Sequence, residues 1–165
     1  MNKPIIGIVA KHYATYKSNK IDTFIRDEVK QAIFDNGAVA IGILPVETAI
    51  NYCGDNWKYN LSMEEKENLI TQLKLCDGII LQGGAVTDNY EIIIAKYCYE
   101  NNIPILGICA GQNNIARALG GTTYKIPNPD KHNNAFDEYV HNIKIDKDSK
   151  FYNIVNTSMM MVNSR

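Results

Sequence analysis

Short apolar runs rich in β-branched residues alternate with segments of helical periodicity, and this alternation restricts the fold more than any other feature of the chain. Runs of about four to eight apolar residues bounded by glycine or proline are typical of strands buried on both faces of a parallel sheet. The predicted strands are residues 4–10, 39–44, 77–82 and 103–108. The predicted helices run from residue 21 to the Asn36-Gly37 stop, onward from Ser62, from Asp88 to residue 101, and over 111–118.

This order of elements predicts an α/β fold with a doubly wound, mostly parallel sheet in a single domain, residues 1–165. In such a sheet the ligand binds beyond the carboxyl ends of the strands. The pattern weakens elsewhere: residues 46–60 and 124–134 are predicted loops, and residues 140–145 and 159–162 are predicted strands. The glycine-containing turns after the third and fourth predicted strands are therefore where a site is expected.

Charge and cysteine content argue against several classes of protein. The chain has 17 basic and 18 acidic residues and a net charge of -1, which does not favour nucleic acid or an anionic membrane as a partner. Its apolar runs are strand-sized and its first residues lack a signal-peptide pattern, so a soluble, cytoplasmic protein is expected. The four cysteines are widely spaced without a C-x-x-C pair, which argues against a zinc site and against a disulfide framework.

The segment Gly107-Ile108-Cys109-Ala110-Gly111 places a cysteine between two glycines, where a predicted strand meets a predicted helix. This is the pattern of a nucleophile elbow, a sharp turn that exposes the side chain and strains the backbone, with a positive φ expected at the cysteine. Side chains in place of the glycines would collide with the neighbouring strand and helix. The positive N-terminal end of the helix favours the thiolate, and the N–H of Ala110 would face a developing oxyanion.

The alternative for any single cysteine is a small buried side chain with no chemical role. At Cys109 the two glycines, the preceding strand and the following helix all favour the nucleophile instead. The other cysteines lack this context. Cys76 and Cys98 lie on or near apolar helix faces and are predicted to be core residues, and Cys53 is predicted to lie in a loop.

Short motifs along nearly the whole chain carry a resemblance to a known family. They are K-P-I-I-G-I, D-G-I-I-L-Q-G-G, D-N-Y-E, N-N-I-P-I-L-G-I-C-A-G, A-L-G-G-T, H-N-I-K-I and V-N-S-R. In these motifs the chain resembles the class I glutamine amidotransferases, and within them the γ-glutamyl-γ-aminobutyrate hydrolase (peptidase C26) branch. The resemblance implies a flavodoxin-like sheet and a hydrolase of γ-glutamyl amides that needs no metal and no organic cofactor.

The resemblance also implies roles for individual residues. Cys109 would attack the carbonyl of a γ-glutamyl amide and form a thioester that water later hydrolyses. The N–H groups of Ala110 and of the Gly83-Gly84 turn would form the oxyanion hole. Glu91 follows that turn and is predicted at least to cap its helix; a role in holding the elbow or the substrate stays open.

The chain departs from the hydrolase branch at two positions. Members of the branch usually have Arg after the cysteine, where this chain has Ala110, and Gln two residues beyond the second glycine, where it has Asn113. Both positions border the substrate pocket, and replacing Arg by Ala removes a charge from it. The amine part of the substrate is therefore left open.

A further departure concerns the general base. In the family, V-N-S-x is followed by His-His-Gln, which carries the base, and later by a Glu that orients it. Because the sequence lacks these residues, we expect it to be the N-terminal portion of the domain, whether as a fragment, a nicked protein or a shortened homologue. A C-terminal segment with the His and Glu is then the expected partner. Of His12, His132 and His141, only His12 lies at the expected edge of the sheet, and an ordinary structural role is favoured for each.

Three functions stay open from the sequence. The first is a cysteine hydrolase of a small-molecule γ-glutamyl substrate. The second is a catalytically inactive homologue that binds glutamine or γ-glutamyl compounds in regulation. The third is a glutaminase subunit that passes ammonia to a synthase. The sequence also leaves the oligomeric state open, a homo-oligomer included.

Overall fold

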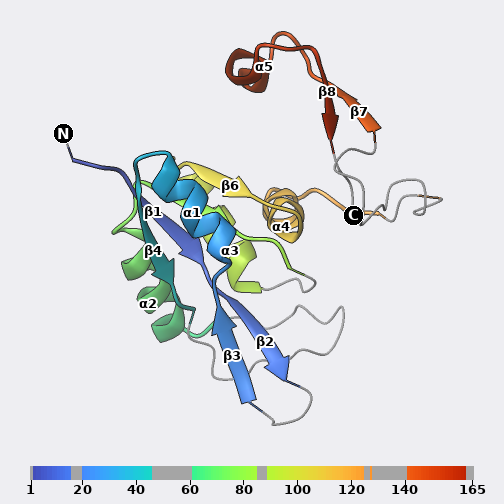
Figure 1. The fold of residues 1–165 in the computed structure, drawn as a ribbon. Helices are drawn as coiled ribbons and strands as arrows, with labels where there is room; N and C mark the ends of the chain where they lie inside the picture. Colours follow the sequence, from blue (N-terminus) through green and yellow to red (C-terminus); the bar gives the residue numbers. More distant parts are fainter. Residues whose placement is uncertain are drawn as a thin grey trace. The chain divides into compact units, whose positions relative to one another are not determined.

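Two compact units make up the computed structural model, Met1–Thr123 and Tyr124–Arg165. The structure describes residues 2–15, 20–45, 61–84, 89–124, 127 and 141–162. The first unit contains a parallel sheet with helices and a separate antiparallel strand pair. The described residues of the second unit form two antiparallel strands and one short helix (Figure 1).

The sheet of the first unit has the strand order β4-β1-β5-β6 in the described residues. These strands are β1 (Ile5–Val9), β4 (Val39–Ile43), β5 (Gly78–Leu81) and β6 (Ile105–Gly107). Each neighbouring pair is parallel, so the prediction of an α/β fold with a mostly parallel sheet is confirmed. Because β5 and β6 are parallel neighbours, the turns that follow them leave the sheet at the same edge.

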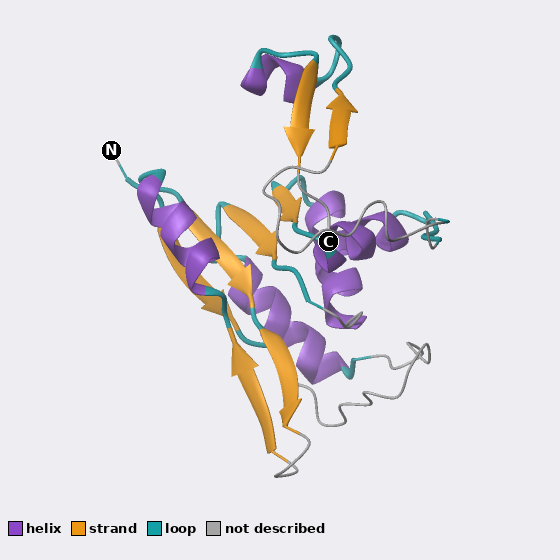
Figure 2. Cartoon of the chain, turned by 45° about the vertical axis from the view of Figure 1, so that its right-hand side comes forward, coloured by secondary structure: helices purple, strands orange, loops and turns teal. Residues whose placement is uncertain are grey.

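Helices cover both faces of this sheet, as Figures 1 and 2 show. Strand side chains alternate between the faces: Ile8 packs with the helix α1 (Asp27–Asp35), whereas its neighbour Val9 joins the larger core cluster on the other face. That larger cluster includes buried residues of α2 (Met63–Leu73) and α3 (Asn89–Glu100). Burial of each Leu or Ile side chain contributes about 1.5–3 kcal/mol to the stability of the fold. The two clusters therefore hold the helices on each face against the sheet.

The fourth helix of the first unit, α4 (Ala110–Ala118), begins directly after β6 and Cys109. It packs against α3 and β6, and Ile115 and Ala118 contact the larger core cluster. Leu119 ends it, and Gly120 follows with φ +84°, in agreement with the predicted stop. None of the helices in the described part of the chain is long and apolar enough to cross a membrane.

The predicted start of α2 is confirmed in detail. The Ser62 hydroxyl accepts a hydrogen bond from the Glu65 N–H at 3.2 Å, and the Glu65 carboxylate accepts one from the Ser62 N–H at 2.7 Å. This reciprocal capping box satisfies two N–H groups that a helix start otherwise leaves without partners. The similar start predicted at Asp88 lies outside the described residues.

The helix predicted from residue 21 is wrong in its first turn. Two antiparallel strands, β2 (Lys11–Thr15) and β3 (Lys20–Phe24), form a pair that extends away from the sheet in Figure 1, and α1 begins only at Asp27. The cause is a contact across the chain. The buried Gln82 amide donates to the carbonyls of Val9 and Phe24 at 2.9 and 3.0 Å. Its oxygen accepts from the Arg26 N–H at 2.9 Å.

The second unit confirms the two late strands, β7 (His141–Lys144) and β8 (Met159–Val162), which pair antiparallel. Between them lies α5 (Lys150–Val155), a helix that the sequence analysis missed. The Ser149 hydroxyl caps it by accepting from the Tyr152 N–H, and Asn156 ends it at φ 52°. A serine before a helix and an asparagine after it are both recognisable in a sequence as helix ends. A helix of six residues, however, is too short to show an apolar periodicity.

Candidate active site

Cys109 occupies the turn between β6 and α4, in the position that the elbow pattern predicts. Its backbone has φ 51° and ψ -112°, and it is one of the described non-glycine residues with a positive φ. Such a conformation costs about 1–3 kcal/mol, so the surrounding structure has to enforce it. The residue is exposed. The predicted strained elbow is confirmed.

Close packing around the two elbow glycines shows what enforces the turn. A Cβ at Gly107 would lie 2.5 Å from the backbone nitrogen of Gln112. A Cβ at Gly111 would collide with the carbonyl oxygen of Leu81 on β5. Because both collisions are with backbone, no side-chain rotation relieves them. The elbow can therefore form only with glycine at these two positions.

The turn after β5 lies beside the elbow. A Cβ at Gly83 would lie 3.1 Å from the Cβ of Cys109, so Gly83 and Cys109 lie side by side. At the start of α4, the Gly111 N–H donates to Ile108 and the Gln112 N–H donates to Cys109. No backbone carbonyl among the described residues accepts from the N–H of Ala110. The structure thus brings together the elbow and the turn that the sequence analysis assigned to an oxyanion hole.

Glu91 is fully buried in the first turn of α3, and it binds two other elements rather than acting only as a helix cap. Its Oε1 forms an ion pair with the Nζ of Lys11 at 2.9 Å. Its Oε2 accepts a hydrogen bond from the Nδ2 of Asn114 on α4 at 2.5 Å. Lys11 and Asn114 are also buried. A buried charge costs on the order of several kcal/mol unless it is paired, which explains why these residues occur together.

Sequence reasoning missed Lys11 and Asn114. Lys11 follows the first apolar strand, at the sheet edge where a site is expected, and this position is a usable indication. Asn114 had no such indication, because a polar residue in a helix is exposed more often than buried. Asn113, which was predicted to border the pocket, lies exposed on α4, and Ala110 lies partly buried at its start.

Two other cysteines differ from Cys109 in their surroundings. Burial raises the pKa of the Cys76 thiol, and the charge of Asp77 raises it further. Burial also raises the pKa of Cys98, to about 11, with a smaller contribution from Cys76. Both thiols therefore stay protonated near neutral pH, as expected for core residues. Cys53 lies outside the described residues.

A family comparison decides what this arrangement is. The model of the family described as glutamine amidotransferase class-I matches residues 46–165, which include both the Gly83-Gly84 turn and Cys109. The chain belongs to the class I glutamine amidotransferase family. The parallel sheet with helices on both faces agrees with this membership, and so does the elbow at the carboxyl end of β6.

Curated members of the family resemble the chain over part of its length. The CTP synthase of Chlamydia trachomatis serovar L2 is 49% identical over 49 residues, which are 28% of this chain and 9% of that protein. The CTP synthase of Sulfurisphaera tokodaii is 35% identical over 92 residues, 54% of this chain and 15% of that protein. The glutamine-hydrolyzing GMP synthase of Tolumonas auensis is 36% identical over 81 residues, 47% of this chain and 14% of that protein. The matches support the amidotransferase family without singling out the γ-glutamyl-γ-aminobutyrate hydrolase branch.

The three histidines that were considered as a general base lie in different parts of the chain. On β2, the Nδ1 of His12 lies 3.2 Å from the Thr23 hydroxyl, and its ring meets the ring of Tyr90 edge-on at 5.7 Å. These contacts give His12 a structural place in the strand pair. His141 begins β7 in the second unit, and His132 lies outside the described residues.

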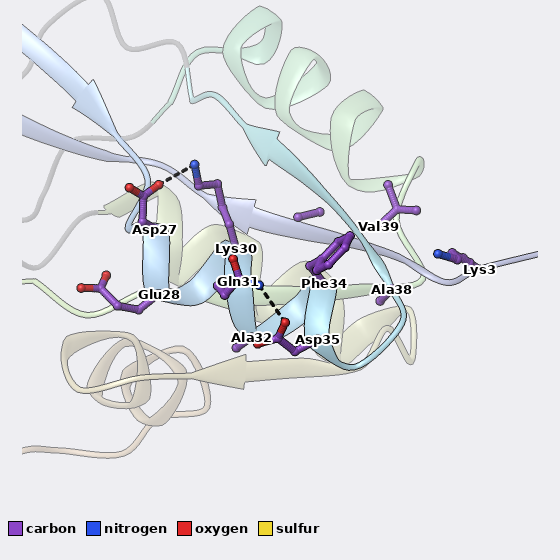
Figure 3. Close-up of a pocket in the computed structure, with 11 residues that line it drawn as sticks. Lys3, Asp27, Glu28, Lys30, Gln31, Ala32, Phe34, Asp35, Ala38 and Val39 are labelled. Carbon is purple, nitrogen blue, oxygen red and sulfur yellow. Dashed lines mark hydrogen bonds and ion pairs between the residues drawn. The ribbon is translucent and has the colours of Figure 1, made fainter.

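A surface hollow lies beside α1 rather than at the elbow (Figure 3). It is lined by Lys3, Asp27, Glu28, Lys30, Gln31, Ala32, Phe34, Asp35, Ala38, Val39 and Ala40. Four of its polar side chains bind one another in pairs: Lys30 pairs with Asp27, and the Gln31 amide donates to Asp35 at 2.7 Å. We therefore assign it no part in the amidotransferase site. The described residues also contain no group of three or more His, Cys, Asp or Glu that could hold a metal ion.

Proposed function

We propose that the protein hydrolyses the amide bond of a γ-glutamyl compound, with Cys109 as the nucleophile. One observation supports this most: an exposed cysteine at positive φ begins a helix and touches the glycine turn of the neighbouring strand. No core cysteine needs this strained geometry, whereas a nucleophile does, because the turn directs its sulfur away from the sheet.

The proposed reaction has two steps. The Cys109 thiolate attacks the amide carbon and forms an S–C bond, and the negative charge moves to the carbonyl oxygen. That oxygen accepts hydrogen bonds from the N–H of Ala110 and from the Gly83-Gly84 turn. Collapse of the intermediate breaks the C–N bond and releases ammonia or an amine, which takes up a proton. Water then hydrolyses the thioester to a free carboxylate and regenerates the thiol.

The proton acceptor for this reaction is proposed to be a histidine. The resemblance implies a histidine after the V-N-S-x motif for this role, and His12 is the alternative within residues 1–165.

Two substrate classes are consistent with this chemistry. Glutamine is favoured by the relatives, since one of them is named as a glutamine-hydrolyzing GMP synthase. In that case the released ammonia would pass to a subunit or domain with synthase activity. A larger γ-glutamyl amide is favoured by the motifs shared with the hydrolase branch.

The test uses the protein expressed from its complete reading frame. Glutamate and ammonia are measured with glutamine as substrate, and free amine is measured with γ-glutamyl amides of larger amines. We expect turnover of one class, and a loss of at least about a thousandfold in Cys109→Ser. Turnover that appears only with a synthase partner would assign the ammonia-supplying function. Binding of glutamine without turnover, and without a covalent adduct at Cys109, would contradict the proposal and favour a regulatory homologue.

A further inference from the structure

A buried polar set joins three segments of the first unit. The ammonium of Lys11 pairs with Glu91, whose other carboxylate oxygen accepts from Asn114. Lys11 is 3% exposed, and Glu91 and Asn114 are 0% exposed. The three residues come from the first position of β2, the first turn of α3 and the middle of α4. Glu91 is thus the central member of the set.

The set reaches both parts of the candidate site. A Cβ at Gly84 would lie 3.5 Å from the Cε of Lys11, so the lysine methylenes pack against the glycine turn. The neighbouring Gly83 in turn contacts Cys109. On the other side, Asn114 belongs to the helix that Cys109 begins. Glu91 is therefore connected through Lys11 to the Gly83-Gly84 turn, and through Asn114 to α4, the helix that follows Cys109.

Stability alone is a poor reason for such a set. Replacing a buried ion pair by apolar side chains of similar volume is often neutral or stabilising, and the neighbouring core cluster on this face is apolar. A reacting constellation, in contrast, has to be held within about 0.5 Å of its productive geometry. A fixed cation beside the turn also favours negative charge that develops there.

We propose that Lys11, Glu91 and Asn114 are positioning residues for the cysteine elbow. Glu91 holds the Gly83-Gly84 turn against the helix of Cys109, and the Lys11 cation makes the turn favourable for an anion. The catalytic meaning of this inference rests on the proposed hydrolase function. The reactivity of Cys109 toward small reagents tests it without any turnover.

The experiment compares alkylation of Cys109 by neutral iodoacetamide and by anionic iodoacetate, at low ionic strength in the full-length protein, with rates from peptide mapping. In Glu91→Gln the lysine charge stays and its counter-charge is removed, so the ratio of iodoacetate to iodoacetamide rates should rise about threefold or more. In Lys11→Met the ratio should fall by a similar factor. The double variant K11M/E91Q carries neither charge, so its ratio should lie between those of Lys11→Met and the wild type.

Two further variants separate charge from structure. Asn114→Leu removes the link to α4 without a change of charge, so both reagents should slow several-fold and alike. Glu65→Gln is the matched control: it also changes a buried carboxylate to an amide, but in the capping box of α2. Its ratio should equal that of the wild type. Thermal unfolding of each variant shows which of them are folded, and the neutral double variant remains informative if a single variant is not.

Opposite shifts in Glu91→Gln and Lys11→Met support the proposal. Equal ratios in all folded variants, shifts in the same direction, or a shift in Glu65→Gln would overturn it. If the full-length protein hydrolyses its substrate, Glu91→Gln should lower kcat severalfold with little change in KM. Opposite ratio shifts in a protein that hydrolyses no γ-glutamyl amide would leave the positioning role standing and reject the hydrolase function.

Discussion

At the scale of single residues, the backbone conformation separates Cys109 from the other described cysteines. It is exposed at φ 51°, while Cys98 is fully buried in the core and Cys76 is partly buried beside it. The sequence context of two glycines predicts this difference, because side chains at these two positions would collide with the backbone of β5 and α4 and prevent the turn at Cys109. Reactivity should follow the same order.

Cys109 should be alkylated before Cys76 and Cys98. At pH 7 to 8, limited iodoacetamide should modify it first, because the other two thiols are buried and their pKa values are raised. Cys98 is also fully buried and its pKa is raised to about 11, so its labelling in the folded protein should stay slower than that of Cys109 at every pH below that value. Peptide mapping by mass spectrometry measures this order. Faster labelling of Cys53 than of Cys109 would contradict the elbow assignment.

Gly111→Ala should destabilise the protein by about 3 kcal/mol or more, at the upper end of the cost of overpacking. The added Cβ would collide with the Leu81 carbonyl, which is held in the sheet. Gly84→Ala is the matched control for stability, because its Cβ would lie 3.5 Å from Lys11, an ordinary contact. Urea unfolding measures both. Equal unfolding free energies for the two variants would show that the elbow does not require glycine.

At the scale of elements, Gln82 decides where the strand pair ends and α1 begins. Its side chain is fully buried and hydrogen-bonds the carbonyls of Val9 and Phe24 and the N–H of Arg26. It therefore satisfies three backbone groups that belong to three segments. Arg26 precedes α1 and makes no side-chain cap, so the helix start depends on Gln82, which directly follows the strand β5.

Gln82→Leu should cost about 2–4 kcal/mol, because it leaves three backbone groups without these partners. Amide hydrogen exchange should accelerate in β2, β3 and the first turn of α1 before it does in β5. Gln72→Leu is the control: Gln72 also makes three hydrogen bonds, to both backbone groups of Leu44 and to Asn68. It is only partly buried, so water can replace these partners. Equal losses of stability would argue against burial as the cause.

At the scale of the whole molecule, the described core and the elbow belong to one unit. Both hydrophobic clusters, the parallel sheet, Cys109 and the Lys11–Glu91–Asn114 set lie within Met1–Thr123. The elbow should therefore form without the second unit.

A fragment of residues 1–123 should fold cooperatively and keep preferential labelling of Cys109. Its thermal transition, followed by circular dichroism, should be a single step, and iodoacetamide should still modify Cys109 before Cys98. The fragment with Gly111→Ala serves as the control that loses the elbow. A fragment without a cooperative transition, or one that labels its cysteines equally, would show that the second unit is needed to form the site.

The sequence by itself determined the parallel strands, the start of α2 at Ser62 and the cysteine elbow. These features depend on residues close together in the chain, so spacing and glycine positions reveal them. The motifs around Gly83-Gly84 and Cys109 also indicated the family to which the chain belongs.

Only the tertiary structure decided that residues 20–24 form a strand and that Glu91 is buried between Lys11 and Asn114. Residues 21, 24 and 25 are apolar at spacings that suit a helix, but Gln82, more than fifty positions away, binds the backbone on either side of Ile25. Glu91 likewise meets its partners from segments far apart in the chain. Hydrogen bonds between distant segments leave no periodic pattern in sequence, because they are set by how the strands and helices pack.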